Sequence, residues 1–106
     1  MMVVTTDDAT GHDVETVLGP AFGVVVRSRG LGGNLTAALR SLGGGEIKEY
    51  TEMLEDARRS AIDRMVQNAH AMGANAVVGM RFDSSEIGQT MSEIVAYGTA
   101  CVVKAP

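Results

Sequence analysis

Few side chains in this sequence could bind a metal ion or take part in catalysis. The candidate metal ligands are His12, Asp83, Glu86 and Cys101, which offer imidazole, carboxylate and thiol groups. A tight zinc or copper site needs three or four such groups in fixed geometry, and the sequence has no Cys-x-x-Cys or His-x-x-x-His spacing. The two carboxylates would suit only a loosely bound hard cation, and a charged hairpin has the same pattern. A bound metal ion is therefore possible, but the ligand spacing does not support one.

The remaining reactive side chains have ordinary structural explanations. His12 stands beside Asp13 in a predicted turn, where a solvated residue is expected, and His70 falls beside an apolar helix stripe. Cys101 lies among apolar residues and is expected to be a small buried side chain. No Ser-His-Asp or Cys-His set can be argued from spacing, so no catalytic or cofactor-binding residue is assigned. An enzyme would need a site that forms across a subunit boundary.

Composition excludes several classes of protein. The 106 residues predict one domain, residues 1–106, with a net charge of −4 and no basic patch for nucleic acid. A single cysteine rules out an intrachain disulfide and is typical of a reducing compartment. We see no signal peptide, and no apolar run approaches the ~20 residues of a membrane span. We therefore expect a cytoplasmic protein without membrane or nucleic-acid partners.

One long helix, at about residues 47–73, is the strongest structural prediction. Its apolar residues recur every three or four positions and form one stripe, with charged residues on the back. Leu54 and Met65 lie centrally on that stripe, so we expect both to be buried. Gly73 is expected to end the helix, because glycine enters the left-handed conformation without steric cost. A short helix at about residues 34–42, with Asn34 as its N-cap, is also predicted.

The other segments predict strands, and the fold class is α+β. Gly19-Pro20 interrupts two apolar runs that we interpret as one bent strand, because these residues often mark a bulge. The sheet is expected to be antiparallel, with three to four strands packed on the long helix and the short one. The predicted strands are 2–6 at an edge, 14–27, 74–82 and 91–103, with 83–89 as a hairpin connection.

The last strand is apolar on both faces, and this predicts an oligomer. Ile94, Ala96 and Ala100 would face the helix, while Tyr97 and Cys101 would face the other way. A sheet that is wet on one side should alternate apolar and polar residues more cleanly. We therefore expect a homo-oligomer, although the short helix could instead cover part of the second face.

The sequence also resembles the YbjQ family over nearly its whole length. The matching residues are Thr5, Thr6, Gly19, Gly23, Gly33, Asn34, Tyr50, Ala57, Arg58, the run Gly-Ala-Asn-Ala-Val-Val-Gly at 73–79, Asp83, Glu86 and Gly98-Thr99-Ala100. The resemblance implies a small, dodecin-like α+β subunit that assembles as a ring-shaped homopentamer. It also carries the family's heavy-metal-binding label, for a family whose biochemical role is uncharacterised.

Two departures from the family pattern affect any ligand contact made there. Residues 44–47 read Gly-Gly-Glu-Ile where the family tends to have Gly-Gly-Arg-Ser, and residues 83–86 read Asp-Ser-Ser-Glu where Asp-Tyr-Glu is usual. Three hypotheses follow. The favoured one is a non-enzymatic homo-oligomeric binding or scaffold protein, holding a small molecule or cation between subunits. The alternatives are a heavy-metal-binding protein, as the family label suggests, and an enzyme with a shared site.

Overall fold

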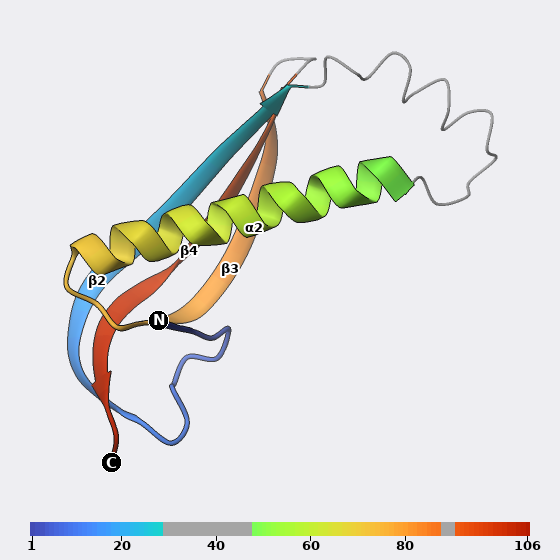
Figure 1. Cartoon of the computed structure of the whole chain (residues 1–106). Coiled ribbons are helices and arrows are strands. Elements are labelled where there is room, and N and C mark those ends of the chain that lie inside the picture. The colour runs from blue at the N-terminus through green and yellow to red at the C-terminus, as the bar shows by residue number, and fades with distance from the viewer. Residues whose placement is uncertain (29–47, 88–90) are drawn as a thin grey trace.

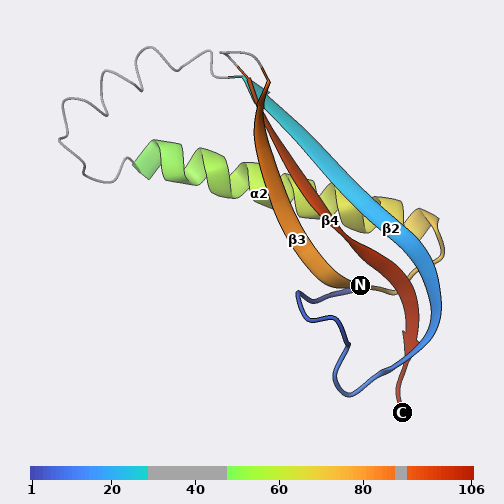
Figure 2. The same ribbon diagram turned by 180° about the vertical axis from the view of Figure 1, so that it is seen from behind.

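The fold is α+β, as predicted, with one described helix crossing a four-stranded sheet (Figures 1 and 2). The computed structural model describes residues 1–28, 48–87 and 91–106. The predicted short helix at 34–42 lies outside these residues. The elements are β1 (Met2–Val3), β2 (Asp13–Ser28), α2 (Lys48–Ala71), β3 (Ala76–Ile87) and β4 (Met91–Lys104). The long helix and the last strand therefore match their predicted bounds to within a few residues.

The sheet is mixed, so the prediction of an antiparallel sheet was wrong in one pairing. Its strand order is β1-β3-β4-β2, and β4 pairs antiparallel with both of its neighbours. β1 instead runs parallel to β3, with Met2 opposite Ala76. The reason is the path of the following residues, which carry the chain from the β3 edge to the β2 edge. β1 lies at the edge of the sheet as expected, but it is shorter than predicted.

The β3–β4 hairpin is longer than the sequence indicated. We expected a polar connection at 83–89, whereas β3 continues to Ile87 and its register with β4 runs to the pair Ile87 and Met91. Residues 83–87 are all exposed, and no described helix residue packs over them. Polar residues are therefore compatible with strand structure there.

β2 is one bent strand, as predicted. Its register against β4 shifts between Val14 and Thr16 and again between Val17 and Gly19. Gly19 has a φ of +123°, a conformation that residues with a side chain rarely adopt. The two shifts bend the strand while β2 and β4 remain paired along their whole length, which accounts for the curvature in Figure 1.

The helix packs on the sheet with almost no space between the two backbones. Ala57, Ala61, Met65 and Ala69 are all buried, with exposures of 0–1%, so the predicted burial of Met65 is confirmed. On the strand below, a Cβ atom at Gly23 would overlap the carbonyl oxygen of Ala61 and the amide nitrogen of Met65. Small residues on both elements therefore allow this close approach.

The predicted burial of Leu54 is wrong within this chain. Leu54 and Met72, on either side of the buried residues Ala57 to Ala69, each have an exposure of 38%. Both views show the N-terminal part of α2 running out past the strands (Figures 1 and 2). Periodicity identified the apolar stripe, but the length of the stripe that the sheet covers depends on the crossing angle.

The end of the helix is capped as the sequence indicated. Gly73 has a φ of +91°, and its amide donates to the carbonyl of His70 at 2.9 Å. The next amide, of Ala74, donates to the carbonyl of Ala69 at 3.1 Å. These two bonds form a Schellman motif, which satisfies carbonyls left free at a helix terminus.

Two helix side chains reach the backbone of the edge strand β2. The Arg64 Nη1 donates to the carbonyl of Val24, and the Asn68 Nδ2 donates to the carbonyl of Phe22, both at 2.6 Å. Residues two apart in a strand direct their carbonyls to the same side. We therefore place both carbonyls on the side of β2 away from β4, where no described strand pairs with them.

Candidate functional site

The N-terminal residues 4–12 cover part of the sheet face opposite the helix. Ala9 is 3% exposed and packs with Ala76, Val78, Cys101 and Val103 in a second apolar cluster. The predicted burial of Cys101 is confirmed, with an exposure of 0%. Sequence reasoning missed this cover, since it treated residues 9–13 as a simple turn. The chain itself therefore covers part of the second apolar face of the last strand.

Backbone bonds hold this N-terminal segment at a fixed place on β3. The amide of Gly79 donates to the carbonyl of Thr6 at 2.7 Å, and the amide of Met80 donates to the carbonyl of Val4 at 3.0 Å. The Arg81 Nη1 adds a bond to the carbonyl of Thr5 at 2.7 Å. Gly79 has a φ of +63° where β3 shifts register, so its amide points at the segment rather than along the ladder.

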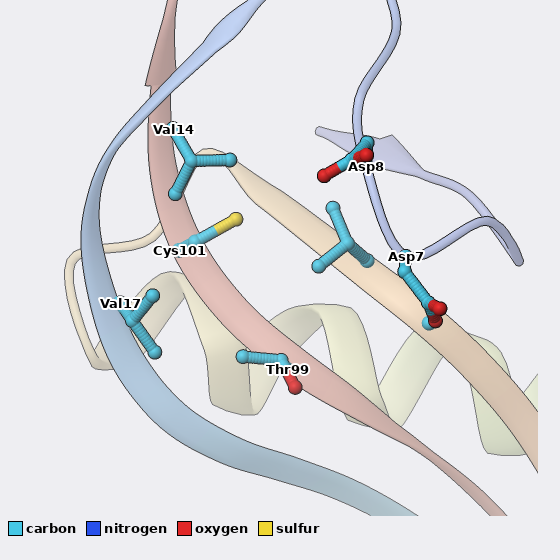
Figure 3. Close-up of a pocket in the computed structure, with 8 residues that line it drawn as sticks. Asp7, Asp8, Val14, Val17, Thr99 and Cys101 are labelled. Atoms are coloured by element: carbon cyan, nitrogen blue, oxygen red, sulfur yellow. The ribbon is translucent and has the colours of Figure 1, made fainter.

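Between this segment and the sheet lies an open cavity of about 350 Å³, here called the N-terminal cavity. Its apolar side chains come from β2, β3 and β4, and its carboxylates come from the N-terminal segment. Figure 3 shows the Asp8 carboxylate and the Cys101 sulfur directed toward the same space. The lining residues are Asp7, Asp8, Val14, Val17, Val78, Gly79, Thr99 and Cys101.

The N-terminal cavity is acidic at one wall and apolar elsewhere. Asp7 and Asp8 are its charged lining residues, and no basic side chain lines it. Burial raises the pKa of the Cys101 thiol above its ordinary value of 9.0, so the sulfur stays protonated at neutral pH. A protonated thiol is a poor nucleophile and a poor metal ligand. The cavity therefore presents carboxylates at one wall and a protonated thiol among its apolar side chains.

A second feature is the part of the same sheet face that residues 4–12 leave uncovered, here called the open sheet face. Phe22, Val24 and Val26 of β2 are 40–51% exposed, and Tyr97 of β4 is 38% exposed. Polar residues follow on the β3 side, where Arg81 stands opposite Tyr97. The apolar surface is therefore a strip along β2 and β4, and it is the kind of surface that usually marks an interaction site.

The structure does not bring the four predicted metal candidates together. His12 lies in the exposed turn before β2, while Asp83 and Glu86 lie three residues apart on β3 and so project from opposite faces. Cys101 is buried under the N-terminal segment. Across residues 1–28, 48–87 and 91–106, no group of three or more His, Cys, Asp or Glu side chains could hold a metal ion. His70 is exposed near the end of α2.

The carboxylates of the N-terminal cavity were not identified from the sequence. Asp7-Asp8 was interpreted only as the end of an edge strand, although these residues line the same cavity as Thr99 and Cys101 in the folded chain. Nothing in their spacing links positions 7–8 to positions 99–101, because the contact depends on the crossing of residues 4–12 over the sheet. The β-branched residues before Asp7 predicted only an edge strand.

Fold and surface together define a small α+β domain, with an open, partly acidic cavity beside an apolar sheet face. A sequence profile described as "Putative heavy-metal-binding", that of YbjQ, matches residues 1–104. The chain belongs to this family, whose curated members carry the name UPF0145. The family resemblance drawn from the sequence is therefore confirmed.

Individual relatives extend this result across bacteria and archaea. A UPF0145 protein of Bradyrhizobium sp. (strain ORS 278) is 68% identical over 104 residues, covering 98% of this chain and 94% of the relative. One from Thermoplasma acidophilum is 58% identical over 104 residues, covering 98% and 87%. A crystal structure of a DUF74-family protein of unknown function from Pediococcus pentosaceus has a TM-score of 0.64, 11% identity and 98% coverage of both chains. That structural likeness supports the fold alone.

The described helix gives no sign of a membrane span. Among the residues that the structure describes, no helix is both long and apolar enough to cross a bilayer. α2 has charged residues along its exposed back, including Glu55 and Arg59, which form an i,i+4 pair at 3.6 Å. Its buried stripe is already packed on the sheet.

Proposed function

We propose that this YbjQ-family protein is a non-enzymatic, homo-oligomeric binding protein whose copies associate through the open sheet face. The observation that carries the proposal is the exposure of Phe22, Val24, Val26 and Tyr97 on one contiguous strip. Burying a large apolar side chain contributes roughly 1.5–3 kcal/mol when it starts fully exposed. Since each of these is about half exposed, the strip would contribute several kcal/mol to association.

The geometry of the strip favours contact through the face rather than through the strand edge. Two carbonyls at the β2 edge already accept bonds from Arg64 and Asn68, so strand pairing there would have to displace them. The face, by contrast, has only solvent over its apolar side chains within the described structure. A ring-shaped, dodecin-like homopentamer is the assembly that the family resemblance suggests, and a ligand would be held in each subunit or between subunits.

Light scattering at micromolar concentration tests the assembly. Five chains of 11.1 kDa would give a mass of about 55 kDa. Val24→Asp places a charge on the open sheet face and should lower the mass toward that of one chain. Gln67→Asp makes the same change of charge on the exposed back of α2 and should leave the mass unchanged. A wild-type monomer, or an unchanged mass for Val24→Asp, would refute association through this face.

Heavy-metal binding is the second candidate function, because the family is described by that property. Cys101 is the single cysteine of the subunit, and its thiol is buried and protonated. A tight site would have to combine ligands from several copies around a ring axis. This candidate therefore also depends on the oligomer, and elemental analysis separates it from the first.

A further inference from the structure

We infer that the N-terminal cavity binds a small organic cation, namely a protonated amine attached to an apolar group. This inference rests on the proposed role as a binding protein, and it names the class of ligand. It is argued from the charge balance of the lining, the position of the apolar side chains and the environment of Cys101.

The charge balance favours a cation. Within the described part of the chain, neither Asp7 nor Asp8 has an ion-pair or hydrogen-bond partner for its carboxylate. Two basic side chains of the neighbouring strands have other partners, since Arg81 donates to backbone carbonyls and Lys104 pairs with Glu15 at 3.3 Å. The cavity therefore has two negative charges that no basic side chain of the described chain neutralises.

The segment that carries these carboxylates is held in place before any ligand arrives. Thr6 is bonded on both sides, accepting from the amide of Gly79 and donating its hydroxyl to the carbonyl of Asp8 at 2.6 Å. Residues 4–6 are thus bonded to β3, and the Thr6 hydroxyl bond holds the main chain of Asp8 against them. A preorganised wall reduces the ordering cost that binding would otherwise carry.

The opposite wall is apolar and partly unoccupied. Val14 is 42% exposed and Val17 is 66% exposed, and both line the cavity with Val78. A hydrated metal ion would make no use of these branched side chains. A ligand with an apolar body would cover them, and the cavity volume of about 350 Å³ lies at the small end of ligand sites, which span roughly 300–1,000 Å³.

Cys101 supplies an independent observation at the floor of the cavity. Its side chain is 0% exposed, it makes no hydrogen bond within the described structure, and its sulfur points into the cavity (Figure 3). The Thr99 hydroxyl lies two residues along the same strand, on the same face. A buried, unpartnered sulfur beside a hydroxyl leaves only weak acceptor capacity at the floor, so the carboxylates would make the main polar contacts of an ammonium group.

The test is a methyl-NMR titration of the full chain labelled at its valine methyl groups. The probe is cyclohexylammonium, and cyclohexanol is the neutral probe of the same shape. We expect saturable shifts at Val14, Val17 and Val78 with the amine, and binding of the alcohol about tenfold weaker, since two partly exposed ion pairs would be lost. Calcium chloride serves as the third probe.

Two variants make the result specific. Asp7→Asn with Asp8→Asn should weaken amine binding about tenfold, because both charges are removed while the backbone bonds are kept. Asp63→Asn with Asp83→Asn makes the same change of net charge away from the cavity and should leave amine binding within about twofold. Circular dichroism of both double variants checks that each is folded.

Three outcomes would overturn the inference. The first is that cyclohexylammonium causes no saturable shift. The second is that cyclohexanol binds as tightly as the amine. The third is that calcium chloride shifts the valine signals while the amine does not. Light scattering on the same samples keeps this test separate from the proposed assembly. If the protein is an oligomer that does not bind the amine, only the ligand assignment is refuted. If it is a monomer that binds the amine, only the proposed assembly is refuted.

Discussion

Replacing Gly23 by alanine should destabilise the protein more than the same replacement at Gly73, because the added methyl group meets the backbone of the helix. Gly23 has no unusual φ, so the substitution brings no backbone strain of its own. The new methyl group would overlap the carbonyl oxygen of Ala61 and the amide nitrogen of Met65. Because both atoms belong to the helix main chain, no side-chain rotation can relieve the overlap.

The size of the effect follows from how far the helix must retreat. Ordinary contact requires the helix backbone to move outward by about 1 Å or more at Ala61, which also loosens the buried Met65. Overpacking a well-packed core typically costs about 1–3 kcal/mol and occasionally more. Since the clash is with backbone at the centre of the only described helix–sheet contact, we expect about 3 kcal/mol, a large part of the ~5–15 kcal/mol that stabilises a domain.

Urea unfolding at one fixed protein concentration measures this loss, with Gly73→Ala as the control. Gly73 has a φ of +91° and nothing within 4 Å of its added Cβ atom, so alanine there costs only the left-handed conformation, about 1–2 kcal/mol. Combining Gly23→Ala with Ala61→Gly should not rescue stability, because the Ala61 carbonyl remains. A Gly23→Ala protein no less stable than Gly73→Ala would refute the close approach of helix and sheet.

Three further predictions concern a side-chain bridge, a buried thiol and metal content. Asn75 pairs with Val103, donating from Nδ2 to its carbonyl at 2.8 Å and accepting from its amide at 2.7 Å. Asn75→Ala should therefore lower the free energy of unfolding by about 1–3 kcal/mol in thermal or urea unfolding. Asn75→Asp should lower it less at pH 4 than at pH 7. The raised pKa of Cys101 means that the unfolded thiol ionises first, so wild-type stability should decline as the pH rises through about 9 and the Cys101→Ala protein should lack that component. Elemental analysis of untagged protein should find no stoichiometric zinc or copper, and Cys101→Ser should leave any metal affinity unchanged. If the protein instead holds one zinc or copper per subunit that is lost in Cys101→Ser, metal binding becomes the leading function.

The sequence was most informative where structure depends on local periodicity. The stripe through Ala57, Ala61 and Met65 located the helix, and the left-handed Gly73 located its end. The bend at Gly19 was also local, since a glycine and a proline together interrupt a ladder. These features could be predicted because each depends on residues a few positions apart.

Features that depend on how the chain crosses itself could not be predicted in this way. The parallel pairing of β1 and the cover provided by Ala9 both follow from the path of residues 4–12 across the sheet. For the same reason the sequence did not place Asp7 and Asp8 opposite Cys101. The exposure of Leu54 depends on the angle between helix and sheet, which periodicity leaves undetermined.

The bonds from Arg64 and Asn68 to the edge of β2 also bear on how the protein would fail under stress. A 16-residue strand rich in valine is a template for adding strands from other chains, and this leads toward cross-β aggregates. Here the donors that occupy its carbonyls belong to the helix, so the edge is protected only while the helix is docked. Detachment of α2 would uncover the inner face of β2 and free its edge in the same event. We therefore expect helix detachment to precede irreversible aggregation on heating, so a variant that loosens the helix should aggregate sooner even where its sheet is intact.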